Sequence, residues 1–253
     1  MSQILIESFP KGKRDRPPNN DYLEVSEFFS DTIQGEGINL GHPAAFLRMK
    51  GCTLNCVWCD TKEVWREGNP YTFYELYNLM YDHGLVEKLR SGHHLVLTGG
   101  SPLRQQTSLI LFLEGFTKEF GFKPYIEIEN ECTLMPAPEM IALVDCWNNS
   151  PKLTSSGNSF KARYNTLILG TLGALNNSWF KFVIQGEEDW EEILENYIQP
   201  GFITKDRIIF MPEGMTTEAI AEHREMVINM AIRHSVRYCS REHIVVWNRK
   251  TGV

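Results

Sequence analysis

The chain lacks any long hydrophobic run, and its apolar stretches fall short of the roughly 18 residues that a membrane-spanning helix requires. Its N-terminus has no apolar segment of signal-peptide length and no cleavage site. Basic residues are outnumbered by acidic ones, which gives a net charge of -7. A nucleic-acid-binding protein needs a clustered basic face, so this charge balance argues against such a partner. These absences predict a cytoplasmic protein that binds neither a membrane nor a nucleic acid.

The sequence also shows no internal repeat, no low-complexity tract and no linker between domains. Its 253 residues, 42% of them hydrophobic, suffice for one sizeable core. The basic run KGKRDR at 11–16 is interrupted by Asp15 and followed by two prolines, which indicates a solvated segment. We therefore predict a polar N-terminal leader over residues 1–21 and a single domain over residues 22–253.

Short β-rich runs alternate with amphipathic segments along most of the chain. We expect strands over 44–49, 94–98, 125–129, 179–185, 207–211 and 243–248, and helices around 72–90, 104–120, 187–198 and 216–234, the last capped by Thr216 or Thr217. The run 140–147 fits either a helix end or a strand. Such alternation is typical of an α/β fold with a parallel sheet. About six repeats predict a partial, incomplete TIM-like barrel rather than a closed one.

The unusual motifs of the chain all follow predicted strands. In barrels of this kind the functional site lies at the C-terminal ends of the strands. The motifs are KGCTLNCVWCDT after 44–49, TGGSP at the end of 94–98, ENE after 125–129, QGEED after 179–185 and MPEG after 207–211. They are therefore predicted to meet on one rim.

Three of the six cysteines, Cys52, Cys56 and Cys59, lie within eight residues, whereas the others are scattered. Clustered thiolates are soft ligands suited to zinc or to an iron–sulfur cluster. A zinc site needs a fourth ligand, for which His42 and Asp60 are the nearest candidates. A [4Fe–4S] cluster held by three cysteines is complete, because its fourth iron stays open for a small molecule. An aromatic residue directly before the third cysteine favours the cluster, and the zinc alternative stays open.

The Cys-x3-Cys-x-aromatic-Cys spacing resembles the signature of the radical S-adenosylmethionine (SAM) enzymes, in which the amino and carboxylate groups of SAM occupy the open iron. The motif TGGSP (98–102) resembles the Gly-Gly-Glu-Pro element of that superfamily. The longer stretch FFSDTIQGEGINLGHPAAFLRMKGCTLNCVWCDT (28–61) resembles the N-terminal signature of the 7-carboxy-7-deazaguanine synthase family. Weaker matches are NSPKL (149–153), FKFVIQGEED (180–189), FMPEG (210–214) and the segment 241–253. The resemblance implies that residues 22–253 form a single radical SAM domain.

The resemblance implies a reaction and its cofactors. The reaction is conversion of 6-carboxy-5,6,7,8-tetrahydropterin to 7-carboxy-7-deazaguanine with loss of ammonia, in 7-deazapurine (preQ0/queuosine-type) biosynthesis. The implied cofactors are a [4Fe–4S] cluster, SAM and Mg²⁺, with an unidentified electron donor and a homodimeric assembly. Two alternatives remain: another radical SAM enzyme, such as a glycyl-radical activating enzyme, or a non-catalytic zinc-binding domain.

The resemblance also implies site residues, none of them catalytic beyond holding cofactors and substrate. The cluster ligands are Cys52, Cys56 and Cys59, and the Mg²⁺ ligand is Thr61. The SAM-binding residues are Trp58, Gly100, Ser150, Pro151, Lys152, Gln185, Gly186, Glu187 and Glu188. The substrate-binding residues are Ile33, Gln34, Gly35, Arg48, Thr98 and Val253, the last through a terminal carboxylate.

The chemistry of several of these residues suits the implied roles. The guanidinium of Arg48 can hold the substrate carboxylate bidentately and does not lose its charge. The hydroxyl of Thr61 is an oxygen ligand of the kind that Mg²⁺ prefers. The side chain of Gln34 offers both a donor and an acceptor to the amide face of a pterin.

Two motifs depart from the family pattern. Ser101 stands where the family usually has a glutamate that contacts the SAM amino group, and a serine hydroxyl carries no charge. The run IENECT (128–133) replaces a Glu-Thr-Asn-Gly-Thr-like run, so Glu127 and Glu129 are not assigned to the site. His243 has no assigned role.

Overall fold

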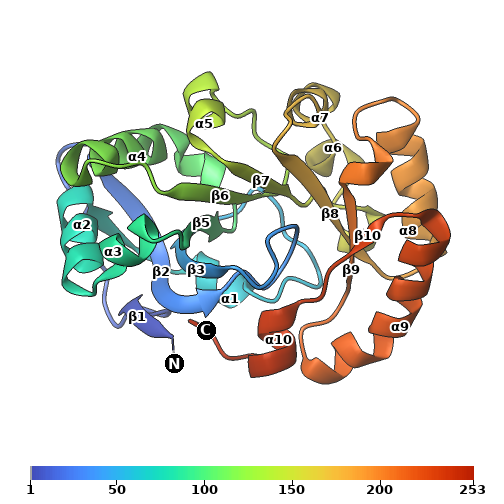
Figure 1. Ribbon diagram of the computed structural model, residues 1–253, viewed down its shortest axis with the longest axis horizontal. Helices are drawn as coiled ribbons and strands as arrows, with labels where there is room; N and C mark the ends of the chain where they lie inside the picture. Colours follow the sequence, from blue (N-terminus) through green and yellow to red (C-terminus); the bar gives the residue numbers. More distant parts are fainter. Residues whose placement is uncertain (1) are drawn as a thin grey trace.

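The computed structural model describes residues 2–253, whose strands form one twisted sheet that curves into an arc without closing (Figure 1). The strand order is β1-β2-β3-β5-β6-β7-β8-β9-β10, and β4 pairs with β2 at one end. The strands are β1 (Gln3–Ile6), β2 (Tyr22–Ile33), β3 (Pro43–Met49), β4 (Asn69–Thr72), β5 (His94–Gly99), β6 (Tyr125–Asn130), β7 (Cys146–Asn149), β8 (Ser178–Ile184), β9 (Ile208–Pro212) and β10 (Arg237–Tyr238). The predicted incomplete α/β barrel is confirmed.

From β3 to β10 all neighbouring strands are parallel, whereas β1, β2 and β4 are joined to their neighbours antiparallel. The helices are α1 (Lys62–Arg66), α2 (Phe73–Asp82), α3 (Leu85–Arg90), α4 (Gln106–Phe120), α5 (Pro138–Leu143), α6 (Phe160–Arg163), α7 (Thr166–Gly173), α8 (Glu187–Ile193), α9 (Thr217–His234) and α10 (Glu242–Trp247). Most of them lie along the outside of the arc, while α10 and the C-terminal end lie on its open side (Figure 1). Among residues 2–253, no helix has both the length and the apolar character needed to cross a membrane.

The predicted parallel strands up to residue 211 are confirmed, as is the N-cap Thr216, whose side chain accepts a hydrogen bond from the backbone N–H of Ala219. The predicted helix 72–90 is divided between α2 and α3 at Gly84, which has a φ of +67°. The ambiguous run 140–147 contains both the end of α5 and the start of β7.

The predicted strand 243–248 is wrong, because this segment forms the helix α10. Its β-branched residues favour a strand, but β10 already occupies the adjacent edge of β9. Only Ile244 of the helix is fully buried. Tertiary context therefore overrides the local preference.

The N-terminal segment is not the independent leader that its composition predicts. Residues of β1 pair antiparallel with β2, with Gln3 opposite Ser30. The basic run is exposed, but Arg16 pairs with Glu24 of β2 at 2.7 Å. The prediction of a separate leader over residues 1–21 is therefore corrected: this segment adds the edge strand β1 to the domain. Met1 lies outside the described residues. The sequence analysis also missed β2, whose buried positions run on both faces and show no simple alternation.

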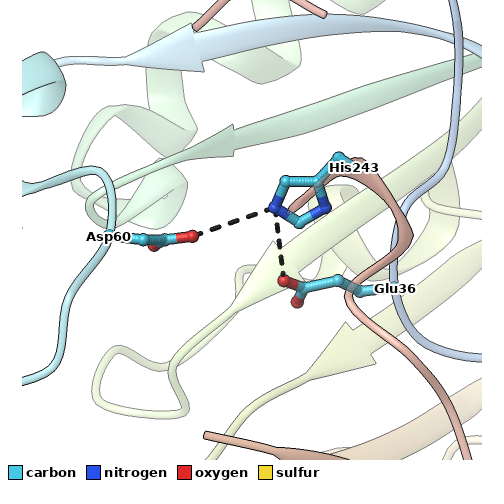
Figure 2. A group of neighbouring side chains, drawn as sticks. All are labelled: Glu36, Asp60 and His243. Atoms are coloured by element: carbon cyan, nitrogen blue, oxygen red, sulfur yellow. Dashed lines mark ion pairs between the residues drawn. The ribbon is translucent and has the colours of Figure 1, made fainter. Parts of the chain in front are cut away.

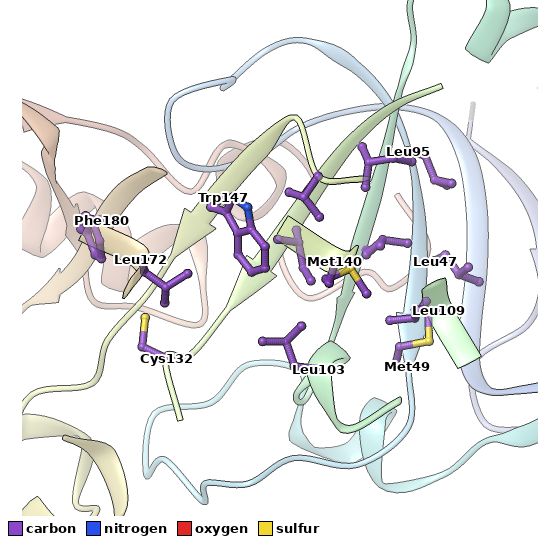
Figure 3. Packing of buried hydrophobic residues seen from close by; sticks show 14 of the residues in the cluster. Leu47, Met49, Leu95, Leu103, Leu109, Cys132, Met140, Trp147, Leu172 and Phe180 are labelled. Carbon is purple, nitrogen blue, oxygen red and sulfur yellow. The ribbon is translucent and has the colours of Figure 1, made fainter. Parts of the chain in front are cut away.

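Alternation along the parallel strands separates the core from the site. Successive side chains of a strand point to opposite faces of the sheet. One face carries apolar residues that pack beneath the outer helices, including Leu47, Leu95, Trp147 and Phe180, and Met140 of α5 packs into the same cluster (Figure 3). The other face carries polar residues at the intervening positions, among them Arg48, Thr98, Glu129 and Lys181. The fold thus places a polar, largely buried surface inside the arc.

Candidate functional site

A cavity of about 500 Å³ opens at the C-terminal ends of the parallel strands. Its wall includes the cysteine loop after β3, the ends of β2, β5 and β6, the middle of β8, and the chain that follows α10. The motifs that follow β3, β5 and β6 thus meet on one rim, as predicted. The motif after β8 does not line it, because Gln185–Glu188 are not among the lining residues. Of the motif MPEG at the end of β9, only Met211 lines the cavity.

All three clustered cysteines line the cavity and carry free thiols. Polar hydrogens point at their sulfurs: the side-chain amide of Asn158 donates to Cys56 Sγ at 3.2 Å, and the indole N–H of Trp65 donates to Cys59 Sγ at 3.5 Å. Burial raises the pKa of the Cys56 thiol. Hydrogen bonds to sulfur are a known means of tuning iron–sulfur clusters. The loop therefore fits a thiolate-bound cluster.

The loop does not fit a single zinc ion. Thiolates on one zinc, at about 2.3 Å from the metal, lie about 3.8 Å apart. Among residues 2–253, the cysteines do not form a group whose ligand atoms all lie within 4.8 Å of one another. The two candidate fourth ligands are occupied elsewhere: the ring of His42 stacks on that of His94 at 3.7 Å, and Asp60 Oδ2 accepts a hydrogen bond from Arg241 at 2.5 Å.

The cysteine loop lies so close to the end of β5 that position 100 has no room for a side chain. A Cβ atom at this position would lie 2.3 Å from the carbonyl oxygen of Gly51 and 2.5 Å from Cys52 Cβ. The next residue, Ser101, is fully buried, and its backbone N–H donates to the same Gly51 carbonyl at 2.8 Å. Gly100 lines the cavity as predicted, whereas Ser101 does not.

A hydrogen bond from one side of its guanidinium holds Arg48 in place. Its Nε donates a 2.6 Å hydrogen bond to Glu27 on the neighbouring strand β2, and the same carboxylate accepts a hydrogen bond from Ser8. Burial alone would lower the pKa of Arg48, but the Glu27 carboxylate raises it. Within residues 2–253 no hydrogen bond uses the two Nη groups. Arg48 therefore remains charged, with donors left for an anionic ligand.

Lys181 of β8 joins two carboxylates inside the cavity. Its Nζ donates to Glu36 at 2.7 Å and to Glu129 at 2.9 Å, and Glu129 also accepts the hydroxyl hydrogen of Thr98 at 2.6 Å. Burial alone would lower the pKa of Lys181, but Glu129 and Glu36 raise it well above its ordinary value. The amine is therefore charged, and it links β8 to β6 and to the segment after β2.

Arg241 extends this network toward the cysteine loop. Its Nε donates to Glu36 at 3.1 Å and its Nη2 to Asp60. Burial would raise the pKa of Glu36, but Lys181 and Arg241 hold it well below its ordinary value. Burial would likewise raise the pKa of Asp60, and Arg241 again holds it low. Both carboxylates are therefore ionised and paired.

Glu36, Asp60 and His243 form the one group among the described residues whose potential ligand atoms lie within 4.8 Å of one another. Figure 2 shows His243 between the two carboxylates, with its Nε2 3.8 Å from each. Because Lys181 and Arg241 already neutralise these carboxylates, the group does not suit a divalent cation. It is better described as a charged network on the wall of the cavity.

The IQG segment lies at the cavity, but the side chain of Gln34 is engaged within the protein. Its Nε2 donates to Glu127 at 2.7 Å and its Oε1 accepts from the backbone N–H of Glu36 at 3.1 Å. Each bond uses only one of the two N–H groups and one of the two oxygen lone pairs, so the use of this amide for a pterin stays a prediction. Ile33 and Gly35 also line the cavity, and a Cβ on Gly35 would meet His243 at 2.3 Å.

The residues assigned to SAM divide between two places. Trp58, Ser150 and Lys152 line the main cavity, where Lys152 Nζ lies 5.5 Å from the centre of the Trp58 ring. Pro151 does not line it. Gln185, Gly186 and Glu188 instead line a second hollow beside α6 and α8, and Glu187 forms ion pairs with Arg233 and His234 of α9. These four residues do not line the main cavity, but the second hollow also includes Ser155, whose carbonyl accepts a hydrogen bond from the indole N–H of Trp58 at 3.1 Å. Their part in SAM binding stays a prediction.

Thr61 and Val253 both line the main cavity. Thr61 occupies the N-cap position of α1, but its side chain makes no capping hydrogen bond. Its closest recorded polar contact is Cys59 Sγ at 3.9 Å. Val253 is 9% exposed, and the chain reaches it through Asn248 and Gly252, both with positive φ.

The sequence analysis missed Lys181, Arg241 and Glu27. It left Glu129 unassigned and considered Asp60 only as a zinc ligand. The available signal was a charged residue inside an apolar run, as in FKFVI around Lys181, which alternation places on the inner face. The partners of Lys181 are distant in sequence, so no pattern around residue 181 could predict which carboxylates it pairs with.

Comparisons with known proteins show which family and which fold this chain shares. Residues 33–130 match a family model described as a 4Fe-4S single cluster domain. The chain is 31% identical over 236 residues to the 7-carboxy-7-deazaguanine synthase of Pyrobaculum aerophilum, covering 91% of this chain and 97% of that protein. It is 30% identical over 252 residues to the enzyme of the same name from Rhodopirellula baltica, covering 94% and 91%. The fold is similar to the crystal structure of QueE from Escherichia coli, with a TM-score of 0.64 and 22% identity over 88% of this chain and 95% of that chain.

Proposed function

Because the chain belongs to the 7-carboxy-7-deazaguanine synthase family, we propose that it converts 6-carboxy-5,6,7,8-tetrahydropterin to 7-carboxy-7-deazaguanine with loss of ammonia, as a step in 7-deazapurine biosynthesis of the preQ0/queuosine type. The observation that carries the proposal is the single cavity lined by both the cysteine loop and the fixed guanidinium of Arg48. One site can therefore hold a redox cofactor and an anionic substrate together.

The cofactor end of the cavity is formed by the cysteine loop. Cys52, Cys56 and Cys59 would hold the [4Fe–4S] cluster, whose iron without a cysteine ligand is available to SAM. Together the bound cluster and SAM supply the radical chemistry that the reaction needs. Trp58 and Lys152 offer SAM an aromatic face and a positive charge beside this loop. Ser150 accepts a 2.7 Å hydrogen bond from Lys152 Nζ and thereby positions it.

The substrate end of the cavity is built around Arg48. Glu27 holds the Nε side of the guanidinium, which directs the two Nη groups to a carboxylate in a bidentate arrangement. Thr98 and the charged network of Glu129, Lys181 and Glu36 offer further polar groups to the ring system. The protein thereby positions its substrate, and no side chain is assigned a proton-transfer step.

The size of the cavity supports a small-molecule substrate. A volume of about 500 Å³ lies within the range of small-molecule sites. A glycyl-radical activating enzyme must instead admit a segment of a partner protein. Residues 248–253, after α10, form part of the wall of this cavity, where a segment of a partner protein would have to lie.

Three further features complete the proposal. Thr61 provides an oxygen ligand for Mg²⁺, the remaining positions being filled by substrate oxygens and water. Val253, which lines the same cavity, contacts the substrate. Family membership supports a homodimer and an external electron donor. The six free cysteines support a cytoplasmic location, because a reducing compartment preserves thiols.

The proposal is tested with anaerobically reconstituted protein. Incubation with SAM, Mg²⁺, a chemical reductant and the carboxypterin is expected to give 7-carboxy-7-deazaguanine, identified by its mass, and to release ammonia. Productive SAM cleavage with unchanged pterin would reassign the substrate. A colourless protein that holds one zinc and no iron after anaerobic purification would overturn the enzymatic function.

A further inference from the structure

Glu131, which follows β6 directly, carries an unsatisfied oxygen at the cofactor end of the cavity. The residue is 4% exposed, lines the cavity and belongs to none of the residue sets assigned above. Its Oε1 accepts hydrogen bonds from Thr53 at 2.9 Å and from Thr133 at 2.6 Å. Its Oε2 is buried and has no hydrogen-bond partner within residues 2–253.

This arrangement is costly in the absence of a ligand. A buried polar atom without a hydrogen bond destabilises a protein by more than the gain of an ordinary hydrogen bond, and a buried carboxylate costs more still. No lysine, arginine or histidine nitrogen of the described chain lies within ion-pairing distance of Glu131. The free oxygen therefore requires a donor that the protein itself does not supply.

The location of Glu131 identifies which ligand supplies that donor. Thr53, which holds Oε1, is the residue directly after Cys52, so the carboxylate is attached to the cysteine loop. The hydroxyl of Thr53 also contacts Ser101 Oγ at 3.1 Å, and the hydroxyl of Ser101 lies 3.7 Å from Cys52 Sγ. Glu131, Thr53 and Ser101 thus form one polar cluster beside the first cysteine, in which Glu131 is the only acidic residue.

We infer that Glu131 accepts a hydrogen bond from the amino group of SAM and so supplies the carboxylate that position 101 lacks. The inference rests on the proposed function, since it requires SAM at the cysteine loop. The amino group of SAM is its donor closest to the cluster, because it is one of the two groups that occupy the open iron. Oε1 stays on the two threonines, which fixes the carboxylate, and Oε2 receives the ligand. Glu131 is therefore a cofactor-positioning residue.

The test compares the wild-type protein with Glu131→Gln after reconstitution of the cluster. Glutamine keeps the shape of the side chain and an oxygen for Thr53 and Thr133, but it turns an N–H group toward the ligand in place of Oε2. The dissociation constant of SAM, measured by equilibrium dialysis without pterin, is expected to rise about 10- to 100-fold, the effect of one hydrogen bond to a charged group. The exposed Glu139→Gln on α5 is the matched control and is expected to bind SAM like the wild type.

A SAM analogue without the amino group isolates the proposed contact. In the wild type, removal of the amino group is expected to raise the dissociation constant strongly. In Glu131→Gln the rise is expected to be smaller, by a factor of about ten or more. Equal losses in the two proteins would overturn the inference, because Glu131 would then act on another part of the ligand. Unchanged SAM affinity in Glu131→Gln with full iron content would overturn it as well. Failure of the cluster-loaded wild type to bind SAM would instead contradict the proposed function.

A crystal structure of the wild-type protein with cluster and SAM provides a second test that needs no variant. The amino nitrogen of SAM is expected within about 3.2 Å of a Glu131 oxygen. An amino nitrogen held by another residue, or Glu131 bound to the pterin instead, would overturn the inference.

Discussion

Glu27 and Arg48 are cross-strand partners in β2 and β3, and a 2.6 Å hydrogen bond joins Oε1 of Glu27 to Nε of Arg48. Both side chains are largely buried, with exposed side-chain fractions of 3% and 12%. The strand pairing thus fixes the guanidinium before any ligand binds. Preorganisation of this kind reduces the entropy that a substrate must lose when it is oriented.

Replacement Arg48→Lys is expected to lower kcat/KM for the carboxypterin by about 10- to 100-fold, or roughly 1.4–2.7 kcal/mol. A lysine keeps the charge, but it cannot hold Glu27 and present two parallel N–H groups to a carboxylate at the same time. Steady-state kinetics of the reconstituted enzyme measure the effect. Arg90→Lys on the surface of α3 serves as the control. Equal kinetics in both variants would remove Arg48 from substrate binding.

Replacement Lys181→Met is expected to lower the free energy of unfolding by about 3–5 kcal/mol, because it leaves Glu36 and Glu129 buried without their shared cation. For a chain of this size the change corresponds to a fall in Tm of about 6–20 °C. Thermal unfolding of the cluster-free protein, followed by circular dichroism, measures it. Lys161→Met, on the exposed surface of α6, should shift the Tm by little. Equal shifts in the two variants would show that the network does not stabilise the fold.

The part of the site that could be predicted from the sequence is the part encoded locally. The three cysteines, Trp58 and Thr61 lie within ten residues, and β3 and its loop bring them to one wall in any parallel barrel. Arg48 lies near the end of β3, just before this loop, and its role was predicted from the family resemblance. Its fixation by Glu27 was not, because β2 was not recognised as a strand.

The remainder of the site depends on pairs that are far apart in sequence. The ion pair of Glu36 with Lys181 joins residues 145 positions apart, and that of Asp60 with Arg241 joins residues 181 positions apart. No periodicity within either segment encodes these contacts. The assignment of α10 as a strand failed for a related reason, since the edge that would have received it is occupied by β10.

Acid is expected to destabilise the cluster-free protein through Glu36. Its pKa is depressed in the folded state below its ordinary value of 4.5, so its contribution to stability is fully present above about pH 4.5. That contribution is lost as the pH falls toward the depressed value, because the unfolded chain then binds a proton that the folded chain does not. In Glu36→Gln the free energy of unfolding should therefore fall less steeply below pH 4.5, by up to about 1.4 kcal/mol per pH unit.

Urea unfolding at a series of pH values between 3 and 7 measures this dependence. Glu191→Gln, at an exposed position of α8, is the control and should follow the wild-type curve. Parallel curves for the wild type and Glu36→Gln would show that the Lys181–Arg241 environment does not hold this carboxylate ionised.

Substitutions of Thr61 show whether its hydroxyl binds a metal ion or caps a helix. Although Thr61 occupies the N-cap of α1, its side chain makes no capping hydrogen bond, so Thr61→Val should leave the Tm nearly unchanged. The same change removes an oxygen ligand of Mg²⁺ while keeping the volume of the side chain. We expect the Mg²⁺ concentration for half-maximal activity to rise about tenfold or more in Thr61→Val. Thr61→Ser retains the oxygen and should stay close to the wild type. If Thr61→Val titrates with Mg²⁺ as the wild type does, the ion is bound without this residue.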